Sequence, residues 1–535
     1  MNQPVIPEGT NHHQDSEGIG RIQVNTIPLS DEVHVVYATY TYSGKVFVSY
    51  TTDKDPDIAD FYNLAILNED GTDFKVIFSD VIATKPKANG IRYMPFQDNT
   101  RLILGDYVLE CMPNIDDCQS TQLVPVEYPS EISDDSRTTH RWSEIIVAPD
   151  NKHVSWTLLR SDVGAAAALG ILHRTQESYV ITSPQLISTT SFFTQDSEDP
   201  EYIIPNAIFG GEVKQFIRGG NALSVAGGGK RGTPDSVLQD LKSATLIPVT
   251  NTPGYNETTI FSPDERLGIV MSTRFSKQTD LAIFGLLPRP YGLHTTMGLT
   301  WAIYMYSIAG VRSFRPGNIG PVLIDIEQSM NVDNYQGLQL TTDEDWVYLS
   351  PMSWHPGGTR AMWLEMLRGS NGAKMRVQTV TLLDYSPQPA VPYESTTDNV
   401  PYGIKDLSLL NKNIERNFQG KIRGKHSGVI LYSRSSSGHS GHTEADYINY
   451  SDDGVQFYNG FEKTVSNLFA ETSYESKLQL TGQTSGEMNL RATFSAVAGS
   501  TPLKLLFDAD ADGNPKSYGY STYNGVTLKI EDMLE

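Results

Sequence analysis

Two stretches of the sequence decide the fold: Ile145–Trp156 (IIVAPDNKHVSW) and Thr259–Val270 (TIFSPDERLGIV). Each has a short apolar strand, a turn carrying Pro and Asp, and a second apolar strand, which is the pattern of a β-hairpin. Two further copies align with them, Tyr93–Leu104 (YMPFQDNTRLIL) and Met352–Trp363 (MSWHPGGTRAMW), and a looser fifth copy is Ile448–Phe457 (INYSDDGVQF). Hairpins repeated at intervals of tens of residues predict a repeat architecture.

The spacing of the copies indicates the size of one unit. Asp98 and Asp150 are 52 residues apart, and Asp150 and Asp264 are 114 apart, which equals two units of 57. A copy hidden near Gly210–Val225 would fill that gap. Pro263 and Pro356 are 93 residues apart, and the excess holds Arg289–Arg315, a Pro/Gly-punctuated apolar insertion. We expect this insertion to contain a helix and to form a lid or wall over one face.

Four-stranded units of this size predict an all-β protein, a seven-bladed β-propeller with loop and helix insertions, with eight blades as an alternative. The runner-up architecture is a pair of β-sandwiches. Residues 1–20 are predicted to be an extended tail, and residues 21–473 the propeller with its insertion at 289–315. Residues 474–535 are expected to close the propeller or to form an appended sheet.

Composition limits the partners. The 535 residues carry 63 acids and 41 bases, a net charge of −22, and this acidic surface disfavours nucleic acid and anionic membranes. No apolar run reaches the length of about 18 residues that a membrane-spanning helix needs. The sequence leaves the oligomeric state open.

Two cysteines and two glycosylation sequons bear on the compartment. Cys111 and Cys118 bracket a six-residue loop that one disulfide could close, with two reduced thiols as the alternative. The sequons lie at Asn256 and Asn449. Together these features predict an extracytoplasmic protein, secreted or periplasmic with its signal removed, against a cytoplasmic alternative.

The hairpin copies resemble the S-P-D-G-K repeat of TolB-type, WD40-like propellers. Asn63–Phe78 (NLAILNEDGTDFKVIF) is similar to the strand pair that follows this motif in that family. The resemblance implies the propeller fold. It does not imply one function, because such blades serve scaffolds, peptidase gates and polysaccharide lyases. The chain departs from the motif where Asn151 and Glu265 replace Gly, and the first copy lacks the Pro before Asp98.

The resemblance also implies that the strand ahead of each Pro/Asp turn lines a central channel. Residues just before these strands would then gather at one channel mouth. They are Asn89, Arg92, His140, Arg141, Glu144, Tyr255, Asn256, Glu257, Tyr348 and Ser350. Convergent polar groups predict a binding site. The alternative is that the inner strands are merely polar and solvated.

A second feature is a set of arginines at matching offsets. Arg160 and Arg274 each lie eleven residues after the turn proline, and Arg368 lies twelve after it. Guanidinium groups on one rim would bind carboxylate, sulfate or phosphate. The alternative is that each arginine holds its own loop in place.

These residues predict an enzyme with acid–base lyase or isomerase chemistry on a small or oligomeric, anionic or polyhydroxylated substrate, without an organic cofactor. We expect His140 or Tyr255 as base or acid, with Glu144 and Glu257 tuning them. Arg92, Arg141, Arg160, Arg274, Arg368 and Asn256 would orient the substrate. The alternative is a non-catalytic propeller that binds a peptide or glycan.

One stretch predicts a metal site. Asp508, Asp510 and Asp512 followed by Gly513 match the first half of a calcium loop, although position twelve is Gly519 rather than Glu. The alternative is an acidic, solvated turn. The resemblance to propeller lyases implies a histidine-rich metal site, but the histidines of this chain show no matching cluster.

Overall fold

The computed structural model describes residues 19–83, 92–133, 138–160, 164–228, 231–276, 281–292, 297–317, 319–341, 343–370, 372–412, 416–437, 439–498 and 503–533. Residues 1–18 of the predicted tail lie outside the described residues, and so does Asn89.

Six four-stranded antiparallel units, here called sheets I to VI, follow one another in the described part of the chain. A parallel pairing of Tyr179 with Val126 and of Val180 with Glu127 joins sheets II and III into one nine-stranded sheet. Sheet I contains β2 (His34–Tyr40), β3 (Val46–Thr51), β4 (Phe61–Leu67) and β5 (Lys75–Val81); sheet II contains β6 (Tyr93–Pro95), β7 (Arg101–Leu104), β8 (Tyr107–Met112) and β9 (Ser120–Glu127). Sheet III contains β11 (Ile145–Val147), β12 (His153–Arg160), β13 (Gly164–Arg174) and β14 (Tyr179–Leu186), with β10 (Thr138–Thr139) on β12.

The remaining sheets follow the same plan. Sheet IV contains β17 (Glu212–Ile217), β18 (Ala222–Gly228), β19 (Pro234–Asp240) and β20 (Leu246–Pro248); sheet V contains β21 (Asn256–Phe261), β22 (Leu267–Ser272), β23 (Val322–Asp325) and β24 (Leu338–Gln339). Sheet VI contains β25 (Trp346–Trp354), β26 (Arg360–Leu367), β27 (Met375–Leu382) and β1 (Ile22–Thr26).

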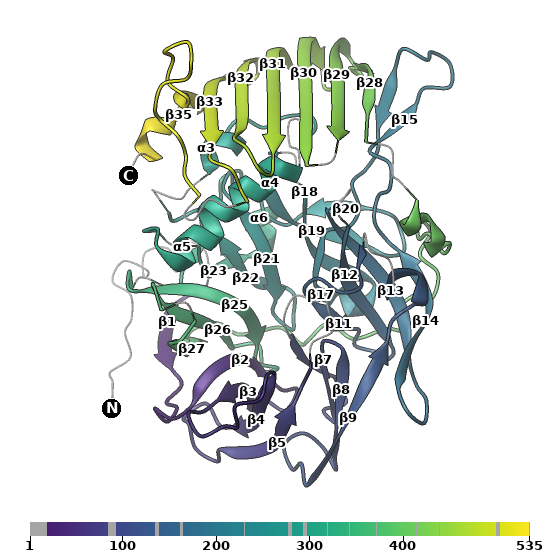
Figure 1. Ribbon diagram of the computed structural model, residues 1–535, viewed down its shortest axis with the longest axis vertical. Coiled ribbons are helices and arrows are strands. Elements are labelled where there is room, and N and C mark those ends of the chain that lie inside the picture. Colours follow the sequence, from purple (N-terminus) through teal and green to yellow (C-terminus); the bar gives the residue numbers. More distant parts are fainter. Residues whose placement is uncertain are drawn as a thin grey trace.

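The six sheets surround a common centre (Figure 1). Their first strands contact one another in the order β2, β6, β11, β17, β21, β25, and β25 contacts β2 again. Sheet VI is completed by the N-terminal strand, because β1 pairs with β27 from Ile22 opposite Leu382 to Thr26 opposite Gln378. In the described residues β1 is thus the fourth strand of sheet VI, and the strands of residues 474–535 pair in another sheet.

In all four copies of the repeated turn, the residue after the Asp position has a left-handed backbone conformation. Asn99, Asn151, Glu265 and Gly358 occupy the same position and have φ of 56°, 59°, 56° and 72°. Glycine adopts this left-handed conformation without strain, and Asn tolerates it better than most residues. The conserved geometry explains why the motif carries Gly in the TolB-type pattern, even where this chain has Asn or Glu.

The hairpin copies form the first two strands of sheets II, III, V and VI, and the hidden copy forms β17 and β18. The fifth copy also forms a hairpin, β30 (Ser440–Ser451) with β31 (Gln456–Asn467), but outside the ring. The described residues thus contain six sheets of this type where the sequence predicted seven, because the strands after residue 416 form a separate sheet, which an isolated bridge joins to Tyr202 through Lys421.

Those strands form one eight-stranded antiparallel sheet, here called the C-terminal sheet. It contains β28 (Phe418–Arg423), β29 (Ser427–Ser437), β30, β31, β32 (Thr472–Gly482), β33 (Gly486–Phe494), β34 (Tyr518–Tyr523) and β35 (Val526–Lys529) in that order. Buried and exposed residues alternate along β32, as expected when one face packs and the other is solvated. The sheet begins at Phe418, so the predicted boundary at 473 falls inside β32.

The insertion packs against the buried face of the C-terminal sheet (Figure 1). It contains the helices α4 (Met297–Tyr304) and α5 (Gly310–Ser313), with a π-helical turn, η2 (Met305–Ala309), between them, and a short helix, α3 (Ala282–Gly285), precedes it. Helix α4 contacts β30, β31 and β32, and α5 contacts β25. One buried apolar cluster spans the insertion, the C-terminal sheet and parts of sheets V and VI.

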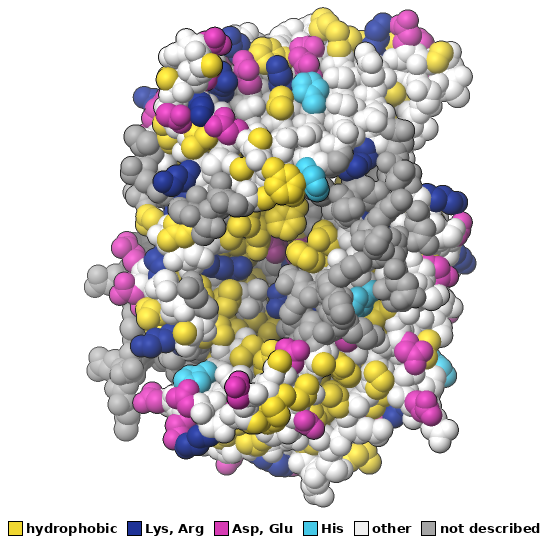
Figure 2. Space-filling view, in the orientation of Figure 1, with side chains coloured by type: hydrophobic (Ala, Val, Ile, Leu, Met, Phe, Trp, Pro, Cys, Tyr) yellow, Lys and Arg dark blue, Asp and Glu magenta, His cyan; other side chains and the backbone are white. Residues whose placement is uncertain are grey.

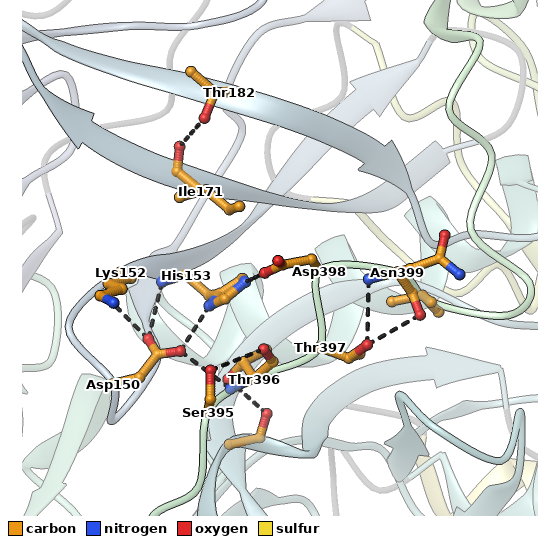
Figure 3. A network of polar contacts seen from close by, with 12 residues as sticks. Asp150, Lys152, His153, Ile171, Thr182, Ser395, Thr396, Thr397, Asp398 and Asn399 are labelled. Atoms are coloured by element: carbon orange, nitrogen blue, oxygen red, sulfur yellow. Dashed lines mark hydrogen bonds and ion pairs between the residues drawn. The ribbon is translucent and has the colours of Figure 1, made fainter.

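A long segment without strands, residues 383–412 and here called the strap, crosses the turn ends of three sheets. Tyr385 donates to Asp264 at 2.9 Å in sheet V, the Glu394 amide donates to the Gly219 carbonyl at 2.8 Å in sheet IV, and Asp398 contacts His153 at 2.7 Å in sheet III. Figure 3 shows His153 held between Asp150 and Asp398 where the strap passes. The strap therefore runs at the end of the ring opposite to the starts of the first strands.

The other elements are short. They are α2 (Ser130–Ser133), β15 (Phe193–Gln195), β16 (Ile203–Pro205), η1 (Arg218–Gly220), α6 (Ile326–Asn331), η3 (Leu407–Asn411) and η4 (Ile530–Met533). None of the helices in the described residues is long and apolar enough to cross a membrane.

Candidate functional site

A buried lysine collects three carboxylates where the first strands of sheets III, IV and V begin. Lys214 Nζ lies 2.7 Å from Glu212 Oε2, 3.3 Å from Glu144 Oε2 and 3.4 Å from Glu257 Oε1. The lysine side chain is 3% exposed, whereas Glu144, Glu212 and Glu257 are 20%, 24% and 17% exposed. A molecule entering this site therefore meets carboxylate oxygens before it meets the ammonium. We call these four residues the ion cluster.

The carboxylates of the ion cluster differ in their electrostatics. Burial opposes ionisation of Glu144, but the charges of Lys214 and Arg92 outweigh it and lower the pKa of Glu144 to about 2. The pKa of Glu212 is raised, because burial and the charges of Glu257 and Glu144 outweigh the attraction of Lys214. One site thus holds a carboxylate that stays ionised and another that keeps its proton to higher pH.

Lys214 itself remains a cation. Burial favours the neutral amine, but the three surrounding carboxylates outweigh it and hold the pKa of Lys214 well above its usual range. An amine that attacks a carbonyl must first lose its proton, so this environment disfavours Schiff-base chemistry at Lys214.

Three further side chains extend the ion cluster. Arg92, which precedes β6, lies 3.7 Å from Glu144 through its Nε atom. The Tyr255 hydroxyl donates to Glu257 Oε2 at 2.9 Å, and burial together with the Glu257 charge raises the pKa of Tyr255 well above its usual range. Tyr348 on β25 is fully buried, and the charges of Arg312, Glu257, Lys214 and Glu144 act on its phenol.

Aromatic side chains of the insertion, here called the aromatic roof, contact the segment that leads into Glu144. Trp301 and Tyr304 of α4 contact each other edge to face with ring centroids 5.8 Å apart, and Trp301 contacts Trp142 at 6.3 Å. Trp142 lies two residues before Glu144 in the sequence. Figure 2 shows hydrophobic side chains gathered in the middle of this face, around the level of α4 in Figure 1. Aromatic faces beside carboxylates provide stacking and hydrogen bonding for a hydroxylated ring.

The structure brings together five of the residues that the sequence predicted at the channel mouth: Arg92, Glu144, Tyr255, Glu257 and Tyr348. Sequence reasoning missed Glu212 and Lys214, although both lie in the hidden copy GGEVKQF at positions 210–216. Their signal was positional, because they stand at the start of a first strand as Glu144 and Glu257 do.

His140 and Arg141 contact a different partner. His140 Nε2 lies 3.0 Å and Arg141 Nε 3.4 Å from Asp106 Oδ1, and the His140 and Arg141 side chains are 6% and 0% exposed. Arg141 also donates to the Ser143 carbonyl at 2.9 Å, and His140 stacks edge to face on Tyr128. These contacts hold buried backbone and side chains near sheets II and III, and no contact to the ion cluster is among them.

The arginines at matching offsets bind backbone carbonyls. Arg160 donates to the carbonyls of Leu410 and Lys412 in the strap. Arg274 donates to the Tyr335 carbonyl at 2.9 Å and to Asn256 Oδ1 at 3.1 Å. Arg368 donates to the carbonyls of Val311 and Gly317 at 2.7 and 2.9 Å. The geometry thus supports the alternative role, in which each arginine holds a loop in place.

Asn256 is fully buried, and hydrogen bonds occupy both ends of its amide. Its Nδ2 donates to Asp235 and to the Thr252 and Gly254 carbonyls, and its Oδ1 accepts from Ser272 and Arg274. Neither a substrate nor a glycan reaches this side chain in the folded protein, so its sequon gives no support for an extracytoplasmic location.

The predicted calcium loop is neutralised by cations. Asp510 Oδ2 lies 3.3 Å from Arg491, and Asp508 Oδ2 lies 3.1 Å from Lys516. Asp510 Oδ1 accepts from the backbone amides of Asp512 and Asn514 at 3.0 and 2.9 Å. These contacts are typical of an acidic turn. Within the described ranges, no group of three or more His, Cys, Asp or Glu is arranged to hold a metal ion.

The two cysteines are unlinked in the structure. Both are buried, and Cys118 Sγ donates to the Ser120 carbonyl at 3.5 Å. Burial, together with the neighbouring Cys118, raises the pKa of the Cys111 thiol. The structure thus has the alternative state, two reduced thiols, and not the predicted disulfide.

Comparison with known proteins identifies no matching family model and no similar curated protein. Among solved structures, a putative TolB from Agrobacterium tumefaciens matches with a TM-score of 0.33 and 12% identity, over 58% of this chain and 81% of that chain. TolB from Acinetobacter baumannii matches with a TM-score of 0.30 and 12% identity, over 71% and 68%. The acylaminoacyl peptidase of Pyrococcus horikoshii matches with a TM-score of 0.30 and 7% identity, over 83% and 57%.

Proposed function

We propose that sheets I to VI are the blades of a closed propeller and that the ion cluster, at one mouth of its channel, is the site of acid–base chemistry on a hydroxylated small molecule or glycan. The C-terminal sheet is then an appended unit that supports the insertion over this mouth. The reaction that we propose for this acid–base site is that of a lyase or an isomerase.

The observation that carries the proposal is that Glu144 and Glu212 touch the same buried ammonium, that of Lys214. Their surroundings lower the pKa of Glu144 to about 2 and raise the pKa of Glu212. Pairs of carboxylates with separated pKa values are typical of sites in which one group donates a proton and the other stays ionised. Glu212 is therefore the proton donor in this proposal, and Glu144 is the charge that stabilises the bound ligand.

The exposed groups of the site favour a hydroxylated ligand. Carboxylate oxygens accept hydrogen bonds from hydroxyl groups, and the Trp142–Trp301 pair offers aromatic faces to a ring. Arg160, Arg274 and Arg368, which were predicted to bind an anion, bind backbone carbonyls instead. An anionic group of the substrate would therefore have to be bound by other residues.

The test is proton exchange in deuterated water. The protein is incubated with a panel of sugars, sugar alcohols and sugar acids, and NMR follows deuterium incorporation and product formation. We expect exchange with at least one class, and we expect Glu212→Gln to lower its rate at least 100-fold because an amide cannot donate that proton. Activity that needs protonated Glu212 should also fall as the pH rises through the raised pKa of this group.

Glu475→Gln is the matched control, because Glu475 lies on β32 with its side chain on the solvated face. This variant should keep the wild-type rate. Exchange that survives in both Glu212→Gln and Glu144→Gln would refute the assignment of the ion cluster. Binding without any exchange would leave the non-catalytic propeller as the function.

A further inference from the structure

A buried hydroxyl group without a hydrogen bond lies beside the ion cluster. Tyr348 is 0% exposed, and its hydroxyl has no hydrogen-bond partner in the described part of the protein. Other buried tyrosines of the ring are satisfied: the Tyr93 hydroxyl lies 2.8 Å from Ser49 Oγ, and Tyr255 donates to Glu257. A buried polar group that stays unpaired costs folding free energy. The Tyr348 hydroxyl is therefore a candidate to bind a ligand.

Two arginines near Tyr348 also keep unused hydrogen-bonding capacity. Arg92 Nε is buried without a hydrogen bond, and its nearest carboxylate oxygen, on Glu144, is 3.7 Å away. Arg312 of α5 donates only weakly, to the Tyr348 carbonyl at 3.4 Å and to Met271 Sδ at 3.7 Å. Among the described residues no carboxylate lies within ion-pair distance of Arg312.

These three groups belong to one place. Arg312 Nε donates to the Tyr348 carbonyl at 3.4 Å, and β25, which carries Tyr348, contacts β21 of the ion cluster. After burial, the charges that act most strongly on the Tyr348 phenol are those of Arg312, Glu257 and Lys214, and the phenol acts in turn on Arg92. They come from three separate elements, since Tyr348 is on β25, Arg92 precedes β6 and Arg312 is on the insertion. Donors that converge from separate elements, while the adjacent carboxylates are already bound to Lys214, form a site for an acceptor.

We propose that Tyr348, Arg92 and Arg312 bind an oxyanion of the ligand whose hydroxyl groups contact the ion cluster. This inference rests on the proposed function and narrows its ligand class to hydroxylated acids, such as sugar acids or sugar phosphates. Guanidinium groups and a phenol hydroxyl are donors that match a carboxylate or phosphate group.

The test uses ligands that differ only in the anion. Binding of D-glucuronate and D-glucose 6-phosphate is compared with binding of D-glucose by calorimetry, with acetate as the anion without hydroxyls. We expect at least one of the acids to bind at least tenfold more tightly than glucose. We expect Tyr348→Phe and Arg312→Gln each to reduce that advantage over glucose at least fivefold.

Tyr348→Phe carries a second readout. Because the hydroxyl has no partner in the free protein, its removal should leave the melting temperature equal or raise it. Tyr93→Phe is the matched control, since it removes a hydroxyl that has a partner: it should lower the melting temperature and leave the preference for acids unchanged.

The outcomes separate this inference from the proposed function. Equal binding of acids and glucose would overturn the oxyanion site and leave the ion cluster as a site for neutral sugars. A preference for acids that survives both substitutions would also overturn it, because other residues would then hold the anion. If none of these four probes binds and no panel compound exchanges protons, both proposals fall.

Discussion

At the scale of single residues, the residue with the left-handed conformation in the repeated turn also makes a hydrogen bond to a neighbouring turn. Asn151 Oδ1 accepts from the backbone amide of Gln97 at 2.8 Å, and Glu265 Oε1 accepts from the Arg218 amide at 2.5 Å. Each side chain therefore reaches the turn of the preceding sheet. Asn and Glu replace Gly at these positions because the contact between neighbouring turns compensates for the backbone conformation.

This arrangement gives a stability prediction. Asn151→Ala should lower the free energy of unfolding by about 2 kcal/mol, because it leaves the Gln97 amide unpaired and puts a Cβ without a polar group at positive φ. Asn151→Gly loses the hydrogen bond but relieves the backbone, so it should cost less than the alanine variant. Urea unfolding measures both, and equal losses in the two variants would contradict the role given to φ.

At the scale of elements, the strap is held by a histidine between two carboxylates. His153 Nδ1 lies 2.6 Å from Asp150, and Nε2 lies 2.7 Å from Asp398 (Figure 3). Burial favours the neutral imidazole, but the hydrogen bonds and charges of Asp150 and Asp398 outweigh it and raise the pKa of His153. The same contacts lower the pKa of Asp150 to about 2, against its burial.

A pH dependence follows for the strap. Because the pKa of His153 is higher in the folded than in the unfolded state, its stabilisation is complete below about pH 6.5 and is lost as the pH rises through the folded value. His153→Gln should therefore lower the free energy of unfolding by about 2 kcal/mol at pH 6 and by less at pH 9. Urea unfolding at the two pH values measures this difference.

His173→Gln is the control for this experiment, because His173 is an exposed residue on β13. We expect no change at either pH. An equal loss at pH 6 and pH 9 in His153→Gln would show that packing, and not the charged imidazole, holds the strap.

At the scale of the whole molecule, a buried ion pair joins the insertion to the C-terminal sheet. Arg289 Nε lies 3.2 Å from Glu462 Oε2, both side chains are 0% exposed, and the hydroxyls of Tyr474 and Tyr447 donate to Glu462 at 2.6 and 3.1 Å. Arg289 also donates to the Phe284 carbonyl at 2.6 Å in α3. This network holds the beginning of the insertion against the C-terminal sheet.

Removing both charges from this network should cost less than the two single removals added together. Arg289→Met leaves Glu462 buried without its partner and should lower the free energy of unfolding by about 3–5 kcal/mol. The double variant Arg289→Met with Glu462→Met should lose clearly less than the sum of the single losses. A double-mutant cycle by urea unfolding measures this coupling.

The exposed pair of Arg491 and Asp510 is the control for the cycle. Their side chains are 30% and 19% exposed, and Arg491→Met should cost less than about 1 kcal/mol. If the losses of unfolding free energy at Arg289 and Glu462 were additive, the pair would not couple the insertion to the C-terminal sheet.

The sequence by itself determined the repeated hairpins and where their first strands begin. Local pattern was sufficient, because a turn with Pro, Asp and a left-handed residue between apolar strands has few other conformations. From this position ten residues were predicted to lie near one another, of which Arg92, Glu144, Tyr255, Glu257 and Tyr348 belong to the site, whereas His140, Arg141 and Asn256 have other partners. The hidden copy at 210–225 was predicted from spacing.

Only the tertiary structure decided the rest. Pairing of β1 with β27 and the separate sheet after Phe418 depend on contacts between residues far apart in the chain, which no local pattern contains. In the same way, His140 and Arg160 have the chemistry of site residues, but Asp106 and the strap carbonyls satisfy them. Which polar groups remain unused, as in Tyr348, is settled by packing, because hydrogen bonds are assigned only when the sheets come together.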